Sequence, residues 1–201
     1  MGTRHKPRLL GFLLTLTVCL ALLHVPVAEA RRAHSGYNPA PQADSFNRQD
    51  WPHWIDADND CQDTRAEILL RDTIGPIKFK RNKPCSVSWG RWICPYTGKE
   101  ILKASELDID HIVPLAHAHR NGGANWPREK KREFANDPLN LVAVEASANR
   151  AKGDQGPDQW RPPQHSFWPE YAKRWRAVKS KYGLRSSAAE EAALREMAGG
   201  R

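Results

Sequence analysis

The sequence predicts an α+β fold in a single domain that runs from about Trp51 to the C-terminus. Short segments with alternating apolar residues, which are typical of strands, are interspersed with segments in which apolar residues recur every three or four positions, as in helices. Residues 31–201 are enough for one hydrophobic core and too few to require a second domain.

The first thirty residues have the pattern of an export signal. Three basic residues precede an apolar stretch over 9–27, and residues 28–30 (Ala-Glu-Ala) have the small side chains at which a signal peptidase cuts. An uncleaved membrane anchor is the alternative, since the apolar run approaches the ~20 residues of a spanning helix, but His24 and Pro26 interrupt the run. We therefore expect cleavage after residue 30 and a secreted or periplasmic protein that does not bind membranes.

Local signals predict the elements that follow the leader. Residues 31–50 lack apolar periodicity and are rich in Pro, Ser, Asn and Gln, so we expect a flexible or loosely packed lead-in. Thr64 and Glu67 have the spacing of a capping box and predict a helix over the next residues. Alternation in 77–80 and 86–89 predicts two short strands, and residues 96–99 (Tyr-Thr-Gly-Lys) predict a turn.

A unit of strand, long loop, strand and short helix comes next. Alternating apolar residues over 107–113 predict a strand that stops at Pro114. The loop contains an expected helix over 128–136, and an apolar strand over 140–144 follows. Residues 146–152 predict a short helix that stops at the next glycine.

Two helices are expected to complete the domain. Tyr171, Trp175, Val178 and Tyr182 lie at steps of 4, 3 and 4 residues, which puts them on one face of an amphipathic helix. Such a stripe is more typical of core packing than of a surface that stacks on bases. Residues 188–197 predict a final helix that frays.

The cysteines fit an oxidising compartment. The exported chain has Cys61, Cys85 and Cys94, which allow one disulfide and leave one thiol. We expect Cys61 to pair with Cys85. Cys94 lies between Trp92 and Pro95, which makes it a candidate for burial. A zinc site is the alternative, but no Cys-x-x-Cys spacing is present.

Residues suited to phosphodiester hydrolysis gather at the ends of the strand, loop, strand and helix unit. This chemistry needs a hard cation with oxygen ligands, a base that deprotonates water, and positive charge near the phosphate. His111 is the candidate base because its ordinary pKa lies near neutral pH. Asp110 and Asn149 offer oxygens acceptable to Mg²⁺ or Mn²⁺. Arg150 and Lys152 are the candidate phosphate contacts.

These residues occur in strings that resemble the HNH, or ββα-metal, endonucleases. The strings are Asp-Ile-Asp-His-Ile-Val-Pro at 108–114, Asn-Leu-Val-Ala-Val at 140–144 and Asn-Arg-Ala-Lys-Gly at 149–153. The nine-residue offset between Asn140 and Asn149 is also similar to that in the HNH lobe of CRISPR effector nucleases. More narrowly, the chain resembles secreted HNH proteins related to the C-terminal nuclease domain of GmrSD restriction enzymes.

The resemblance implies a ββα-metal core flanked by helices and gives each site residue a role. It implies that His111 is the general base and that Asp110 and Asn149 ligate one divalent ion, with Mg²⁺ expected first and Mn²⁺ second. It implies that Asn140 orients the His111 loop by hydrogen bonding, and that Asp108 assists as an outer carboxylate.

The expected function is that of an exported, metal-dependent endonuclease with low sequence specificity. DNA is the expected substrate and RNA an open alternative. Low sequence specificity is expected because no added recognition module is visible. A formal net charge of +8 at pH 7 is compatible with a polyanionic partner, although many secreted proteins are basic for solubility alone. The other hypotheses are an exported nucleic-acid-binding protein without catalysis and a nuclease toxin. A monomer is expected.

Two further polar groups receive structural interpretations. His117 and His119 lie two residues apart on an expected helix and so point in different directions, which favours loop or surface positions. Residues 56–67 begin with alternating aspartates and end in glutamate, which partly mimics a calcium-binding EF-hand loop. Cys61 stands where the sharp turn of that loop requires glycine, so a solvated turn and helix cap are expected instead.

Overall fold

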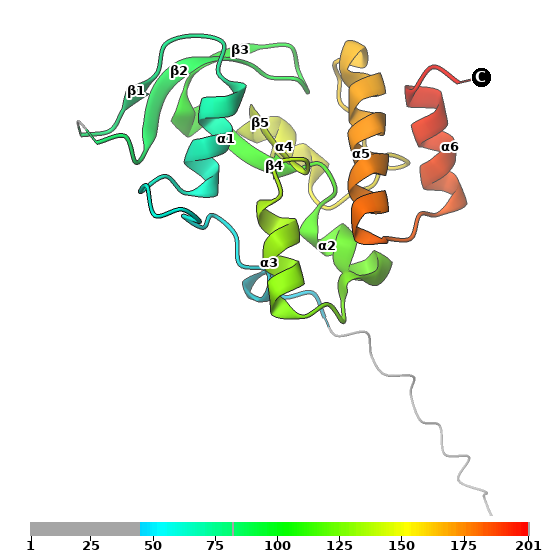
Figure 1. The fold of residues 1–201 in the computed structure, drawn as a ribbon. Helices are drawn as coiled ribbons and strands as arrows, with labels where there is room; N and C mark the ends of the chain where they lie inside the picture. The colour runs from blue at the N-terminus through cyan, green and yellow to red at the C-terminus, as the bar shows by residue number, and fades with distance from the viewer. Residues whose placement is uncertain (1–44, 82, 201) are drawn as a thin grey trace, which may run out of the picture. The chain divides into compact units, whose positions relative to one another are not determined.

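The computed structural model describes residues 45–81 and 83–200, and Figure 1 shows its ribbon. The leader predicted at residues 1–30 and most of the predicted lead-in lie outside these residues. Within residues 45–50, the structure has a 3₁₀ turn, and the ring of Phe46 packs at 5.7 Å from that of His119. No helix of the described part is long and apolar enough to cross a membrane.

The described chain combines helices with small antiparallel sheets, which confirms the predicted α+β class. In chain order the elements are η1 (Arg48–Asp50), α1 (Thr64–Asp72), β1 (Lys78–Phe79), β2 (Val87–Ile93), β3 (Glu100–Lys103), η2 (Ala104–Glu106), β4 (Leu107–His111), α2 (Leu115–Ala118), η3 (His119–Gly123), α3 (Arg128–Asn136), β5 (Leu141–Glu145), α4 (Ala146–Lys152), η4 (His165–Phe167), α5 (Trp168–Tyr182) and α6 (Ala188–Met197).

The first helix, α1, begins as predicted but with a different cap. Asp63, not Thr64, is the N-cap, and its Oδ1 accepts a hydrogen bond from the Ala66 amide at 2.8 Å. Thr64 is already helical, and its hydroxyl lies 3.0 Å from the Ile55 carbonyl oxygen. The helix buries Ile68 among other residues and lies beside β2 and β5 (Figure 1).

The three-stranded sheet has the order β1-β2-β3, and all its strands are antiparallel (Figure 1). β2 extends four residues beyond the predicted strand, to Ile93, and Trp92 pairs with Ile101 of the unpredicted strand β3. The predicted turn at 96–99 connects them. Gly98 has a φ of 74° there, in the left-handed region that favours glycine.

β4, β5 and α4 form the strand, strand and helix unit that the sequence predicts. The two strands pair antiparallel in continuous register from Leu107 with Glu145 to His111 with Leu141. β4 ends at His111, before the proline at which the sequence places its end. α4 follows β5 directly and packs against both strands. The long connection between the strands contains α2, η3 and α3, so it is a folded part of the domain.

The last two helices, α5 and α6, lie side by side (Figure 1). All four residues of the predicted apolar stripe on α5 are buried, which confirms the core interpretation. α6 is more firmly packed than a fraying helix, because Leu194 and Met197 are buried. Both helices therefore contribute to the hydrophobic core.

The expectation that His117 and His119 lie at the surface is wrong, because both are buried. The His117 ring packs edge-on against Trp175, and its Nε2 lies 3.4 Å from the Nζ of Lys179. Lys179 in turn donates to both carboxylate oxygens of Glu190, at 2.5 and 2.8 Å. Burial acts to raise the pKa of Glu190, but hydrogen bonds from His117, Lys179 and Trp175 outweigh it and lower the pKa to about 2. The Lys179–Glu190 ion pair thus ties α5 to α6, and His117 connects α2 to this pair.

Cys61 and Cys85 form a disulfide across 24 residues, and Cys94 is free and buried. Closing a loop of this length lowers the entropy of the unfolded chain, which stabilises the fold by about 3 kcal/mol.

Reduction of the disulfide with dithiothreitol is therefore expected to lower the free energy of unfolding by about 3 kcal/mol in urea titrations. The double variant Cys61→Ser/Cys85→Ser is the control, since dithiothreitol should not change its unfolding. An unchanged wild-type midpoint after verified reduction would contradict this prediction.

Candidate active site

The strand, strand and helix unit brings three predicted site residues into one pocket of about 250 Å³. Asp110 and His111 come from the end of β4, and Asn149 comes from α4. Asn140 immediately precedes β5, opposite the end of β4, because the pairing of His111 with Leu141 brings these chain ends together. Residues 29 to 39 positions apart in the sequence therefore meet through the antiparallel pairing of β4 with β5 and through the short helix α4 that follows.

The His111 ring is held in one tautomer by a backbone carbonyl. Its Nε2 lies 2.8 Å from the oxygen of Ala135, and because a carbonyl only accepts, Nε2 carries the hydrogen. Nδ1 is then the ring nitrogen with the free lone pair. The Trp54 ring stacks on the imidazole at a centroid distance of 5.8 Å. Burial lowers the pKa of His111 to about 3, so the ring is neutral near pH 7.

Asn140 is fully buried and fixes the backbone that follows His111. Its Oδ1 accepts from the Val113 amide at 2.8 Å, and its Nδ2 donates to the Val113 carbonyl at 3.1 Å. Its own carbonyl accepts from the Ile112 amide at 2.7 Å. These three hydrogen bonds fix the backbone directly after His111. That Asn140 thereby orients His111, as the resemblance implies, stays a prediction.

Asp110 lies in a buried network with Tyr96 and Lys152. The Tyr96 hydroxyl donates to Oδ2 of Asp110 at 2.5 Å. The Lys152 amine lies 3.0 Å from Oδ1 and 2.8 Å from Oδ2, and it also donates to the His111 carbonyl at 2.8 Å. Burial raises the pKa of Asp110, while Lys152 and Tyr96 act in the opposite direction. The network therefore fixes the carboxylate and the backbone of the neighbouring His111 together.

Neither of the two residues predicted to contact phosphate has a free basic group in this pocket. The Lys152 side chain is 0% exposed and its amine is occupied by Asp110 and the His111 carbonyl. Arg150 is exposed but lines a different pocket, which it shares with Lys99. The helical period explains the difference, because residues 149 and 152 share a face of α4 whereas residue 150 is turned about 100° from 149. Neither basic residue lines the pocket with His111.

The oxygen donors at the pocket fit one hard cation. Asp108 accepts a hydrogen bond from Asn149 Nδ2 at 3.2 Å, which orients the amide, and Oδ1 of Asn149 accepts none from the described chain. Asp110 has about four lone-pair sites, of which Lys152 and Tyr96 use three. One carboxylate site and one amide oxygen therefore remain, and both suit Mg²⁺ or Mn²⁺.

Tyr96 is the site residue that sequence reasoning missed, because it was assigned only to a turn. Only the three-dimensional pairing of its hydroxyl with Asp110, fourteen residues away, reveals its place. Tyr171 provides a matched comparison. It too is 0% exposed, and its ring centroid is 5.9 Å from that of Tyr96, but its hydroxyl has no hydrogen-bond partner in the described chain.

If Asp110 ligates Mn²⁺ as the resemblance implies, Tyr96→Phe is expected to weaken Mn²⁺ binding by about 10-fold, because partners of a ligating carboxylate typically contribute that much. Tyr171→Phe is expected to bind Mn²⁺ as the wild type does, since it removes a hydroxyl without a partner. Calorimetric titration with Mn²⁺ measures both constants without any need for cleavage. Equal effects of the two variants would show that Tyr96 acts only through packing.

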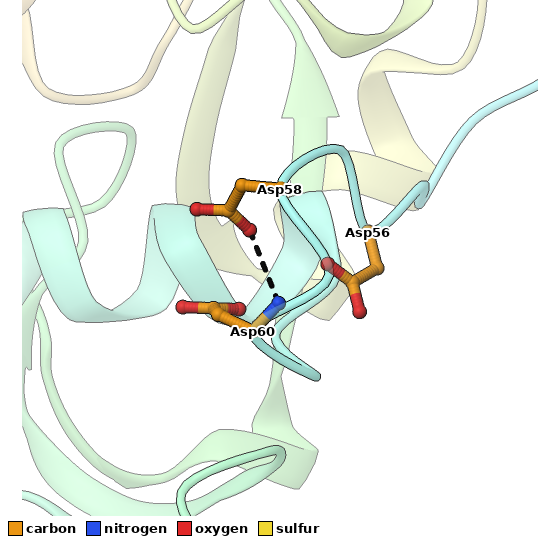
Figure 2. A group of neighbouring side chains, drawn as sticks. All are labelled: Asp56, Asp58 and Asp60. Carbon is orange, nitrogen blue, oxygen red and sulfur yellow. Dashed lines mark hydrogen bonds between the residues drawn. The ribbon is translucent and has the colours of Figure 1, made fainter.

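An acidic cluster lies apart from this pocket, in the exposed turn before α1. Figure 2 shows Asp56, Asp58 and Asp60, whose carboxylates offer oxygens within 4.8 Å of one another. Each carboxylate accepts a backbone hydrogen bond within the turn: Asp56 from Cys61 at 3.0 Å, Asp58 from Asp60 at 3.4 Å, and Asp60 from Gln62 at 2.7 Å. Cys61 has a φ of 75° in the position where glycine is typical. The cluster has the contacts of the solvated turn that the sequence predicts.

Comparisons with known proteins show the family to which the chain belongs. The family described as GmrSD restriction endonucleases, C-terminal domain, matches residues 63–197. A protein of Arthroderma benhamiae described as an uncharacterized secreted protein is 40% identical over 179 residues, which is 87% of this chain and 86% of that relative. No solved structure matches the chain. The chain belongs to the family of GmrSD restriction endonuclease C-terminal domains.

Proposed function

We propose that this protein is an exported, metal-dependent endonuclease that hydrolyses phosphodiester bonds of DNA with low sequence specificity. The observation that carries the proposal is the single tautomer of His111 in a pocket that it shares with the oxygen donors Asp110 and Asn149. Membership of an endonuclease domain family supports the same reaction class. RNA is the alternative substrate.

His111 is the proposed general base. The Ala135 carbonyl holds the hydrogen on Nε2, which leaves Nδ1 to accept a proton from the attacking water. An anionic phosphodiester in the pocket would raise the pKa of the ring, because negative charge stabilises the imidazolium. The hydrogen bonds of Asn140 keep the backbone next to His111 in place during this transfer.

Asp110 and Asn149 are the proposed ligands of one Mg²⁺ or Mn²⁺ ion. Such an ion, when bound, stabilises negative charge on the phosphate and on the leaving 3′ oxygen. Tyr96 and Lys152 hold the Asp110 carboxylate, and Asp108 holds the Asn149 amide, so both donors are oriented before an ion arrives. Because the bond between phosphorus and the 3′ oxygen breaks, hydrolysis leaves 5′-phosphate and 3′-hydroxyl ends.

An extracytoplasmic site of action is part of the proposal. Three observations support it: the leader pattern of residues 1–30, the Cys61–Cys85 disulfide, and the description of the relative as a secreted protein. The proposed partner is nucleic acid, bound by a monomer.

A labelled DNA duplex incubated with Mg²⁺ or Mn²⁺ tests the proposal. Products with 5′-phosphate ends that a ligase rejoins are expected, with loss of cleavage in EDTA and its return on adding metal. Cleavage should also weaken steeply with salt, because the substrate is a polyanion. The competing hypothesis of a binding protein predicts DNA binding that survives EDTA and no cleavage in any metal, and that outcome would overturn the proposal.

A further inference from the structure

The pocket lacks the phosphate contacts predicted for it but contains one other basic side chain. Of the residues that line it, Arg48 is the only one with a lysine or arginine side chain. The pocket has two acidic residues, and both are already paired: Asp110 with Lys152 at 2.8 Å and Asp154 with Arg120 at 2.6 Å. A phosphodiester that enters beside His111 therefore meets Arg48 as its available cation.

The Arg48 guanidinium is free to take such a ligand. Arg48 is exposed, and its side chain forms no hydrogen bond or ion pair with residues 45–81 or 83–200. It is nevertheless near the base. Its side chain lines the same pocket as His111.

The backbone that carries Arg48 is anchored to the domain. Arg48 opens the turn η1, and its carbonyl accepts from the Trp51 amide at 3.1 Å. The preceding Phe46 packs against the Trp51 ring at a centroid distance of 6.3 Å. Arg128, at the start of α3, donates to the Gln49 carbonyl at 3.3 Å. Only the side chain of Arg48 must therefore be ordered when a ligand binds.

We propose that Arg48 binds the substrate phosphate next to His111. The proposal rests on the nuclease function proposed above and names its phosphate contact. A guanidinium presents paired N–H donors that match two phosphate oxygens, and it keeps its charge at all relevant pH values. Arg48 precedes residues 63–197, which the family model matches.

Binding of a labelled DNA duplex in EDTA tests Arg48 without cleavage. In a His111→Ala background of the full-length chain expressed for export, Arg48→Ala should raise Kd about 10-fold. It should also reduce the slope of log K against log salt by about 0.9, the value for one phosphate contact. Arg48→Lys should keep the slope but bind more weakly than Arg48, because an ammonium lacks the paired donors.

Arg195→Ala is the matched control, because Arg195 is also exposed, lies on α6 and does not line the pocket. Its Kd and slope should stay near those of the parent. If Arg48→Ala behaves as Arg195→Ala while the wild type cleaves DNA, the Arg48 proposal is overturned and the nuclease function stands. If the wild type cleaves nothing in any metal, the proposed function fails, whatever the binding assay shows for Arg48.

Discussion

Replacing His111 with alanine is expected to lower the rate of DNA cleavage by about 10²–10⁴-fold, the usual contribution of a general base. The variant removes the imidazole that lines the pocket, while the proposed metal ligands Asp110 and Asn149 remain in place. Single-turnover kinetics with enzyme in excess measure this loss directly, because substrate binding and product release do not then limit the rate.

His165→Ala is the matched control for His111→Ala. His165 is exposed in η4 and stacks near Trp168 at 4.2 Å, away from the pocket residues. It should cleave at the wild-type rate, and both variants should bind DNA as the wild type does. A His111→Ala rate within a few-fold of the wild type would assign the base to another group.

Lys152→Met is expected to lower the free energy of unfolding by about 3–5 kcal/mol, the usual effect of breaking a buried ion pair from one side. The methionine keeps the length of the side chain but leaves the Asp110 carboxylate buried without its cation, and it removes the bond to the His111 carbonyl. Urea denaturation in EDTA measures this change without a contribution from bound metal.

The double variant Asp110→Asn/Lys152→Met separates charge from packing. Because removing both partners of a buried pair costs far less than removing one, it should recover much of the stability. It should not recover cleavage, since the proposed metal ligand Asp110 is changed. A single Lys152→Met variant that unfolds like the wild type would contradict the buried ion pair.

Much of the fold follows from local patterns in the sequence. Alternation over 107–113 and the apolar run at 140–144 correctly predict the two strands that pair at the site, because both are buried and short. β3 escaped prediction because only Ile101 of its four residues is buried, so no alternation marks it. The burial of His117 escaped as well, since its partners lie on α5 and α6, more than fifty residues away.

Residues of the candidate site could be predicted from the sequence only where they belong to a sequence motif. Asp110, His111 and Asn149 line one pocket, and Asn140 makes hydrogen bonds next to His111. The partner that fixes the tautomer could not be predicted, because it is a backbone carbonyl of α3. A sequence also shows only which face of a helix a lysine occupies, and not that its amine turns inward. This is why Lys152 was predicted to contact phosphate.

Plasmid DNA is the substrate that tests the central claim most directly. The exported protein should convert supercoiled plasmid to nicked and linear forms with Mg²⁺ or Mn²⁺, and this conversion should stop in EDTA and in the His111→Ala variant. If the wild-type protein leaves both plasmid and RNA intact across metals, pH values and salt concentrations, the protein is not the nuclease that its site indicates.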